Sequence, residues 1–275
     1  MSIRFVKYTA LGNDYLVLEG LAQPQPKSIV KICDRKSGLG ADGVLIPRNT
    51  DGVFGVHIFN SDGSLAEMSG NGLRIFARYL WDQSAVSDAE FDIATETRIS
   101  RCQVLDDGAA VSVDMGKVRF NSAAIPMTGP QRDVLRKQLQ VDGRILEISA
   151  ANIGNPHCVL IKENISPEET QRLGPIIEEH RSFPNRVNVQ FVRVIDHENL
   201  QIEIWECGSG YTLSSGSSSC AATAVAHRLG HCGPSVNIHM PGGRLHVEID
   251  SDDRVRLRGP VSRIASGILS PEFAT

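Results

Sequence analysis

The chain has 275 residues, of which 41% are hydrophobic and 22% are charged, and its net charge at pH 7 is -4. These values are typical of a globular protein with one large domain or two smaller ones. The acidic balance gives no electrostatic basis for binding nucleic acid or an anionic membrane surface. No apolar run reaches the ~18 residues that a membrane-spanning helix needs.

The N-terminal segment has no apolar signal core and is predicted to form a first strand, so we expect a cytoplasmic protein. The six cysteines are scattered without paired spacing, which argues against a disulfide framework. His227, His231 and Cys232 lie close together in the sequence, but no second group of ligands stands near them. We therefore predict no metal site.

The first half of the chain alternates short strands with turns rich in Gly, Asn and Asp. A helix is predicted at 28–33, and the clearest amphipathic helix covers 71–81. The predicted strands are residues 3–8, 15–18, 44–46, 53–59, 90–93, 98–105 and 109–113. A domain boundary is expected near 115–126.

The second half repeats this order of elements, which suggests two similar domains. Its predicted helices are residues 166–173, 174–180 and 213–229. Its predicted strands are residues 145–152, 158–161, 187–194, 201–205, 236–240, 245–249 and 255–257.

Two segments place a serine and a glycine directly before a helix: Ser69-Gly70 and Ser215-Gly216. A helix N-terminus offers unpaired backbone N–H groups and the positive end of the helix dipole, so it can hold a carboxylate. Two such ends would bind the α-carboxylate of an amino acid and leave one serine on each face of its α-carbon. This layout is typical of a racemase that uses two acid–base groups.

Nine short blocks carry a resemblance to the diaminopimelate epimerase family over nearly the whole chain. They are residues 12–14, 40–43, 59–64, 67–72, 154–157, 186–189, 205–208, 212–216 and 241–243. The resemblance implies an α+β fold of two pseudo-symmetric domains, each a mixed β-sheet wrapped around a central helix, with the active site in the cleft between them. The expected domains are 1–117 and 118–261, with the final strand, about 262–275, packing back on the first. The resemblance also implies a homodimer that uses no pyridoxal phosphate or metal.

The resemblance also implies a role for individual positions. Two cysteines of the family remove and return the α-proton, and their positions match Ser69 and Ser215. The backbone N–H groups expected to hold the reacting carboxylate are those of Gly70, Asn71, Gly216 and Ser217. The side chains expected along the distal arm of the substrate are Asn13, Asn60, Asn155 and Asn188. Glu206 is expected to face a substrate ammonium group and to help order His157.

The chain departs from the family pattern at three places. Both thiols are hydroxyls, an arginine that pairs with a distal carboxylate is Cys207, and a glutamate is Tyr211. A thiol has a pKa of about 8.5, whereas an alcohol is a much weaker acid. A serine therefore removes a proton efficiently only if another base accepts its own proton. His157 and Glu206 are the candidates for that base.

Three functions stay open at this point. The first is isomerisation by proton abstraction and return at the α-carbon of an amino acid, either LL- to meso-diaminopimelate or a related substrate. The second is a dehydratase or isomerase that acts on a different amino or hydroxy acid. The third is a non-catalytic protein that binds an amino acid.

Overall fold

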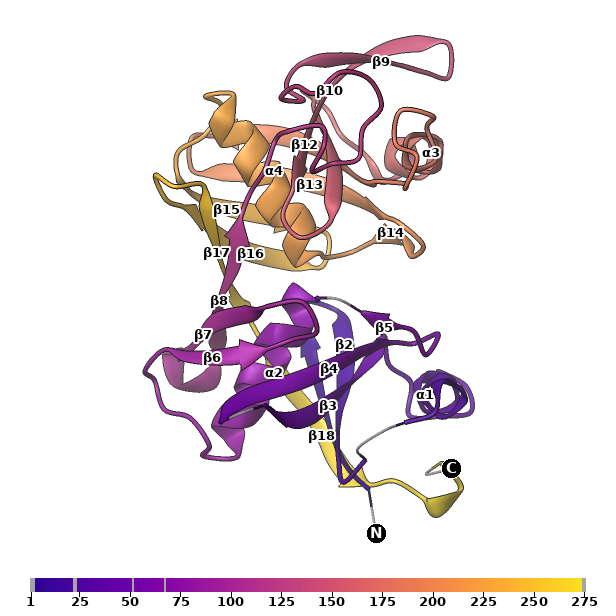
Figure 1. The fold of residues 1–275 in the computed structure, drawn as a ribbon, viewed down its shortest axis with the longest axis vertical. Coiled ribbons are helices and arrows are strands. Elements are labelled where there is room, and N and C mark those ends of the chain that lie inside the picture. The colour runs from indigo at the N-terminus through magenta and orange to yellow at the C-terminus, as the bar shows by residue number, and fades with distance from the viewer. Residues whose placement is uncertain (1–2, 22–23, 51, 67, 274–275) are drawn as a thin grey trace. The chain divides into compact units, whose positions relative to one another are not determined.

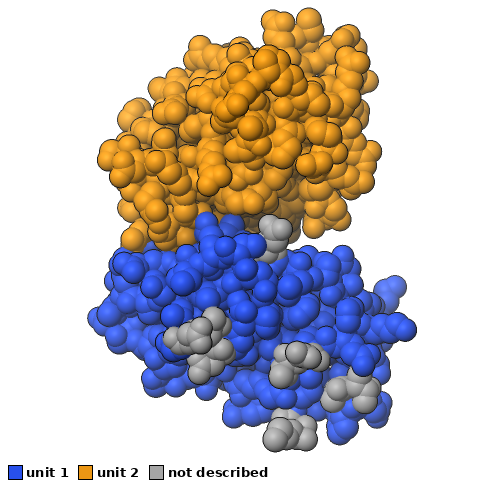
Figure 2. Space-filling view, viewed as in Figure 1, with its two compact units in different colours: residues 1–113, 258–275 blue, residues 114–257 orange. Residues whose placement is uncertain are grey.

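A computed structural model describes residues 3–21, 24–50, 52–66 and 68–273. The chain forms two compact units (Figure 2), of which unit 1 comprises residues 1–113 and 258–275 and unit 2 residues 114–257. The chain passes from one unit to the other inside β8 (Ala110–Lys117) and again inside β17 (Arg254–Pro260). Within the described residues, no helix is long and apolar enough to cross a membrane.

Unit 1 is a mixed sheet with two helices, α1 (Pro26–Cys33) and α2 (Gly70–Asp82). Besides β8 and β17, its strands are β1 (Arg4–Ala10), β2 (Asn13–Glu19), β3 (Gly43–Thr50), β4 (Val53–Asn60), β5 (Leu65–Ala66), β6 (Phe91–Ala94), β7 (Ile99–Leu105) and β18 (Ser262–Ile268). β1 and β2 are antiparallel, β2 and β3 parallel, β3 and β4 antiparallel, β4 and β6 parallel, and β6 and β7 antiparallel. β18 pairs with β1.

Unit 2 repeats the same sequence of pairings, and its two helices are α3 (Pro167–Glu178) and α4 (Gly216–Arg228). Its strands are β9 (Lys137–Val141), β10 (Arg144–Asn152), β11 (Pro156–Ile161), β12 (Asn188–Asp196), β13 (Asn199–Glu206), β14 (Gly210–Thr212), β15 (Ser235–Met240) and β16 (Gly243–Ile249). β10 and β11 are antiparallel, β11 and β12 parallel, β12 and β13 antiparallel, β13 and β15 parallel, and β15 and β16 antiparallel. The two units therefore share one topology, as predicted.

The helices also correspond between the units. α2 and α4 each bury ten of their thirteen residues, which a helix does only when structure surrounds it. Figure 1 shows each of them inside the curve of its own sheet. α1 and α3 bury a single stripe and cover the outer side of the sheet. The prediction of a mixed sheet around a central helix is confirmed in both units.

One prediction about the helices is wrong. Residues 166–173 and 174–180 were expected to form two helices, but α3 is one helix that ends at Glu178. Gly174 lies inside it because the Trp205 indole packs there, and a β-carbon at Gly174 would be 2.5 Å from Trp205 Cγ. The glycine thus marks a close contact between the helix and the sheet and not a break in the helix.

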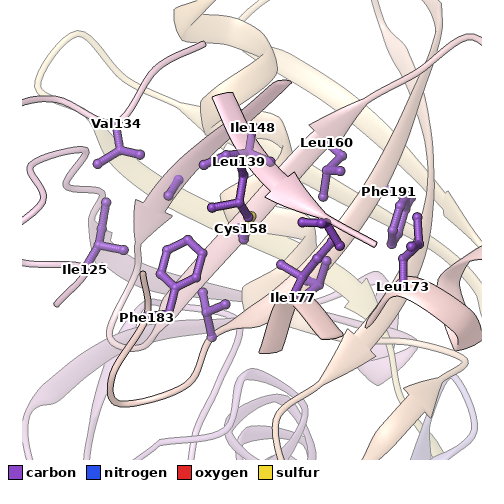
Figure 3. Close-up of a cluster of buried hydrophobic side chains, with 14 residues drawn as sticks. Ile125, Val134, Leu139, Ile148, Cys158, Leu160, Leu173, Ile177, Phe183 and Phe191 are labelled. Carbon is purple, nitrogen blue, oxygen red and sulfur yellow. The ribbon is translucent and has the colours of Figure 1, made fainter. Parts of the chain in front are cut away.

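A cluster of buried apolar side chains joins α3 to the sheet of unit 2 (Figure 3). It includes Leu173 and Ile177 from the buried stripe of the helix and Phe191 from β12. Burying such side chains stabilises the fold by ~1.5–3 kcal/mol each. A smaller cluster does the same for α1 in unit 1, around Ile29 and Ile32. The two clusters thus hold each outer helix against the sheet of its own unit.

Candidate active site

Ser69 caps the N-terminus of the buried helix of unit 1. Its backbone is extended, with φ -142° and ψ 121°, and its Oγ accepts a hydrogen bond from the Gly72 N–H at 3.0 Å. This is the N-cap geometry that serine favours, and it places the Gly70 and Asn71 N–H groups in the first turn of the helix. The serine hydroxyl thus lies next to the N-terminus of the helix, as the sequence predicts, where backbone N–H groups can bind an anion.

A tyrosine that the sequence analysis did not identify lies against this serine. The Tyr15 hydroxyl, from β2, donates a hydrogen bond to Ser69 Oγ at 3.4 Å. The Tyr15 ring lies over Gly43, where a β-carbon would approach Tyr15 Cε1 to 2.5 Å. The same β-carbon would lie 2.3 Å from the Phe59 carbonyl oxygen, so both the ring and the neighbouring strand require glycine at position 43. This glycine, in the turn 40–43, was the only sequence signal for the tyrosine.

A hydrogen-bond network orients Asn13 and Asn71, two of the three asparagines of unit 1 that were predicted to bind substrate. Asn71 Nδ2 donates to Asn13 Oδ1 at 3.0 Å, and Asn13 Nδ2 donates to Asp42 Oδ2 at 2.9 Å. Arg35 bridges the carboxylates of Asp42 and Asp14, with Nη2–O distances of 2.7 Å to each. Charge-assisted bonds of this kind hold their partners firmly. Three sequence blocks, 12–14, 40–43 and 69–71, are thus brought together.

Asn60 has a different environment from Asn13 and Asn71. It ends β4, and its Nδ2 donates to Ser64 Oγ at 2.9 Å across an exposed turn. The link between this turn and the network is through the backbone, because Ser61 N–H donates to the Asp42 carbonyl at 3.1 Å. In this structure the Asn60 side chain closes a turn.

Ser215 caps the buried helix of unit 2 as Ser69 caps that of unit 1. Its backbone has φ -150° and ψ 128°, and its Oγ accepts a hydrogen bond from the Ser218 N–H at 3.3 Å. Ser217 Oγ lies 3.5 Å from Ser215 Oγ, so the first turn offers hydroxyls as well as the Gly216 and Ser217 N–H groups. Each unit therefore carries a serine at the N-terminus of its buried helix. We call the residues around Ser69 the half-site of unit 1 and those around Ser215 the half-site of unit 2.

The partner of Ser215 is a carboxylate. Glu206, the last residue of β13, lies next to the hydroxyls of Ser215 and Thr212, which favour its charged form. Burial raises the pKa of the Glu206 carboxyl above its ordinary value, and the hydrogen bonds from Ser215 and Thr212 offset part of that rise. Glu206 was expected to help order His157, but the structure directs its carboxylate to Ser215.

His157 is held instead by Asn155 in the turn before β11. The two side chains join through His157 Nε2 and Asn155 Oδ1, 2.8 Å apart, so Nε2 carries the proton. The imidazole is fully buried, which lowers its pKa to about 3. His157 is therefore neutral at physiological pH and supports the fold of the half-site without gaining a charge.

A buried glutamine connects His157 to the helix cap. Gln190 interacts with the His157 ring, and its Nε2 donates to Ser218 Oγ at 3.0 Å. Among the described residues, His157 Nδ1 and Gln190 Oε1 have no hydrogen-bond partner as placed. Turning the amide over would let Nε2 donate to Nδ1 and Oε1 accept from the Ser218 hydroxyl, which would satisfy both atoms. A polar residue inside the apolar strand 187–194 was the sequence signal for this role.

Asn188 and Cys207 form the other side of the unit 2 half-site. Asn188 Oδ1 accepts from the Cys207 N–H at 2.9 Å, and its Nδ2 donates to the Pro156 carbonyl at 3.0 Å. Partial burial and the neighbouring Glu178 carboxylate raise the pKa of the Cys207 thiol. The thiol therefore stays protonated near neutral pH, which makes it a poor base.

A cation lies beside Cys207 although the arginine expected at that position is missing. The Arg186 side chain lies beside the Cys207 thiol and forms ion pairs with Glu178 at 3.3 Å and Glu179 at 3.2 Å. It is half-exposed, so its guanidinium can meet a ligand from solvent. Tyr211, the other departure from the family, donates to Glu203 Oε2 at 2.6 Å. Burial first, and Glu203 second, raise the pKa of that tyrosine.

No cluster of three or more His, Cys, Asp or Glu side chains suited to a metal ion occurs among the described residues. The half-sites instead offer hydroxyls, amides, carboxylates and helix N-termini. Such groups can bind a carboxylate and exchange a proton with a neighbouring carbon.

Comparisons with known proteins show the family of the chain. The sequence model of the family described as Diaminopimelate epimerase matches residues 5–121 and 149–264. The chain is 47% identical to "Diaminopimelate epimerase 2" of Nostoc sp., over 98% of this chain and 97% of that protein. It is 37% identical to the diaminopimelate epimerase of Nostoc punctiforme, over 98% of this chain and 100% of the relative.

Among solved structures, a hydroxyproline epimerase from Agrobacterium vitis with bound trans-4-hydroxy-L-proline has the same fold. Its TM-score is 0.72 at 14% identity, over 99% of this chain and 94% of that one. With family matches in both halves and relatives aligned over nearly their full lengths, the chain belongs to the diaminopimelate epimerase family, whose named members are isomerases.

Proposed function

We propose that the protein is an isomerase that removes the proton from the α-carbon of an amino acid and returns it to the opposite face. The observation that carries this proposal is the repeated serine at the N-terminus of a buried helix, Ser69 in unit 1 and Ser215 in unit 2. The helix ends bind the α-carboxylate, and the carboxylate stores the electron pair while the proton is absent. Ser69 and Ser215 stand at the positions that match the family's two acid–base residues.

No pyridoxal phosphate takes part in this proposal, because the acid–base groups all come from the chain. The Asn13–Asp42 and Asn188–Cys207 hydrogen bonds hold these two asparagine side chains in fixed orientations, so a substrate meets oriented groups. A homodimer is a further prediction from the family, and light scattering of the purified protein checks it.

LL-diaminopimelate is the first substrate to test, because the relatives carry its name. The replacement of the family's arginine by Cys207 favours a substrate without a distal carboxylate. Arg186 beside Cys207 favours a substrate that has a distal carboxylate, since a guanidinium binds a carboxylate well. L-Lysine separates the two cases, because it is diaminopimelate without the distal carboxylate.

The test is proton NMR of the protein with each compound in D₂O. Loss of the α-proton signal, with inversion seen on a chiral column, establishes the isomerase. Exchange of LL-diaminopimelate but not L-lysine assigns Arg186 to the distal carboxylate, and Arg186→Gln then raises the KM. If neither compound nor a panel of L-amino acids and hydroxyprolines exchanges its α-proton, the proposal is wrong.

A further inference from the structure

The side-chain hydrogen bonds of the unit 1 half-site all run in one direction. The buried Arg74 of α2 donates from Nη2 to Asn71 Oδ1 at 2.8 Å. Asn71 Nδ2 donates to Asn13 Oδ1 at 3.0 Å, and Asn13 Nδ2 donates to Asp42 Oδ2 at 2.9 Å. A guanidinium can only donate hydrogen bonds, and a carboxylate can only accept them. The two charged ends of this chain of bonds therefore decide which way each amide between them faces.

The accepting end of the chain, the Asp42 carboxylate, is held by two further donors. Asp42 Oδ2 also accepts from the Asp14 N–H at 2.9 Å, and Asp42 Oδ1 accepts from Arg35 Nη2 at 2.7 Å. The same Arg35 nitrogen lies 2.7 Å from Asp14 Oδ1, so one guanidinium serves both carboxylates. Bonds between charged groups are the stronger kind, and they leave the Asp42 carboxylate little freedom to turn away from Asn13.

The half-site of unit 2 orients its asparagine by other means. Asn188 Oδ1 accepts from the Cys207 N–H, and its Nδ2 donates to the Pro156 carbonyl. Both partners are backbone groups, which stay in place when a side chain is exchanged. The Asn13 amide instead has side-chain partners at both of its ends, so a single substitution at position 42 can release it.

We propose that Asp42 is a positioning residue that holds the Asn13 amide, and through it the Asn71 amide, in the orientation that a substrate carboxylate meets. This inference rests on the proposed function. An amide nitrogen carries two N–H groups, and the chain of bonds uses one from each asparagine, so the second can donate to a ligand oxygen. Donors that are already oriented bind an anion without first losing side-chain freedom.

The competing role for Asp42 is to hold the segments 12–14 and 40–43 together. The backbone already does this, because the Asp42 N–H donates to the Asp14 carbonyl at 2.9 Å and parallel pairing aligns Tyr15 with Gly43. Asp42→Ala removes the carboxylate and keeps both of these connections. We therefore expect the variant to fold with the two segments in place and with the Asn13 amide released.

A double-variant cycle separates the two roles, because a residue that acts through Asn13 has no effect once that amide is gone. We would measure KM and kcat for α-proton exchange of LL-diaminopimelate in D₂O, and its Kd by calorimetry. The proteins are wild type, Asp42→Ala, Asn13→Ala and the combined variant. Asp92→Ala, which breaks the surface ion pair between Asp92 and Arg101 of unit 1, is the matched control. Circular dichroism confirms that each variant folds.

The positioning role predicts that Asp42→Ala raises KM and Kd by about 5-fold or more, because the released amides must be ordered when the ligand binds. In the Asn13→Ala background the same change alters Kd by less than about 2-fold. A spectroscopic signature is expected without any ligand. The side-chain amide signal of Asn13 in a ¹⁵N–¹H NMR spectrum, assigned by its absence from Asn13→Ala, moves in Asp42→Ala and stays in place in Asp92→Ala.

Two results would overturn this assignment. One is a Kd and KM that Asp42→Ala leaves unchanged, and the other is an equal rise of Kd with and without the Asn13 amide. A wild-type protein that binds LL-diaminopimelate but exchanges no α-proton overturns the proposed isomerase, and the Kd values still decide the role of Asp42. A wild-type protein that does not bind this compound overturns the positioning role for it.

Discussion

The buried imidazole of His157 makes unit 2 sensitive to mild acid. Its pKa is about 3 in the folded protein, against an ordinary value of 6.5, because burial disfavours the charged ring. Above pH 6.5 the ring is neutral in both states and has no effect on stability. As the pH falls below 6.5, the unfolded chain binds a proton that the folded protein does not, so stability is lost until the pH reaches the folded pKa.

The size of the loss follows from the two pKa values. Each pKa unit corresponds to about 1.36 kcal/mol, so lowering the pH from 7.5 to 5.0 costs about 2 kcal/mol through this residue. In His157→Gln an amide replaces the ring and still donates to Asn155, so that loss disappears. The variant is expected to be less stable than wild type at pH 7.5, by about 1–3 kcal/mol, and to lose less on acidification.

Urea unfolding at the two pH values measures both quantities. The chain has two tryptophans, Trp81 in unit 1 and Trp205 in unit 2, so a Trp81→Phe background leaves Trp205 fluorescence as the probe of unit 2. All other titrating groups are common to the two proteins and cancel in the difference. If both proteins lose the same stability within about 0.5 kcal/mol, burial does not hold His157 neutral, and the reasoning fails.

Three further substitutions test the remaining contacts. Tyr15→Phe removes the hydroxyl that donates to Ser69; we expect kcat for inversion of LL-diaminopimelate to fall about 10-fold or more, with unchanged thermal unfolding as the control. Gly43→Ala puts a methyl group 2.3 Å from the Phe59 carbonyl oxygen and 2.5 Å from the Tyr15 ring, so it should displace both and lower kcat at least as much as Tyr15→Phe; full activity would show that the ring position is unimportant. Gly174→Ala brings a methyl group to 2.5 Å from Trp205 Cγ and should cost unit 2 about 1–3 kcal/mol in urea unfolding, whereas an unchanged midpoint would mean that the helix can shift freely.

Some features of each half-site follow from short stretches of sequence. A serine followed by glycine before a run of helix-forming residues predicts an N-cap, and Ser69 and Ser215 both adopt it. This is because a cap needs only its own hydroxyl and an N–H group three residues on. The alternating strands and the helix expected at 71–81, observed as Gly70–Asp82, depend on similarly local periodicities.

The partners of the two serines depended on the tertiary structure. Tyr15 reaches Ser69 across 54 residues, and it does so only because β2 pairs with β3 in the register that sets its ring over Gly43. Glu206 reaches Ser215 because a turn and β14 bring the end of β13 back to the start of α4. A change of one residue in either register would turn these side chains to the opposite face of the sheet. The sequence therefore determined where the two hydroxyls lie in the helices, and only the packing of the strands decided that one has a phenol beside it and the other a carboxylate.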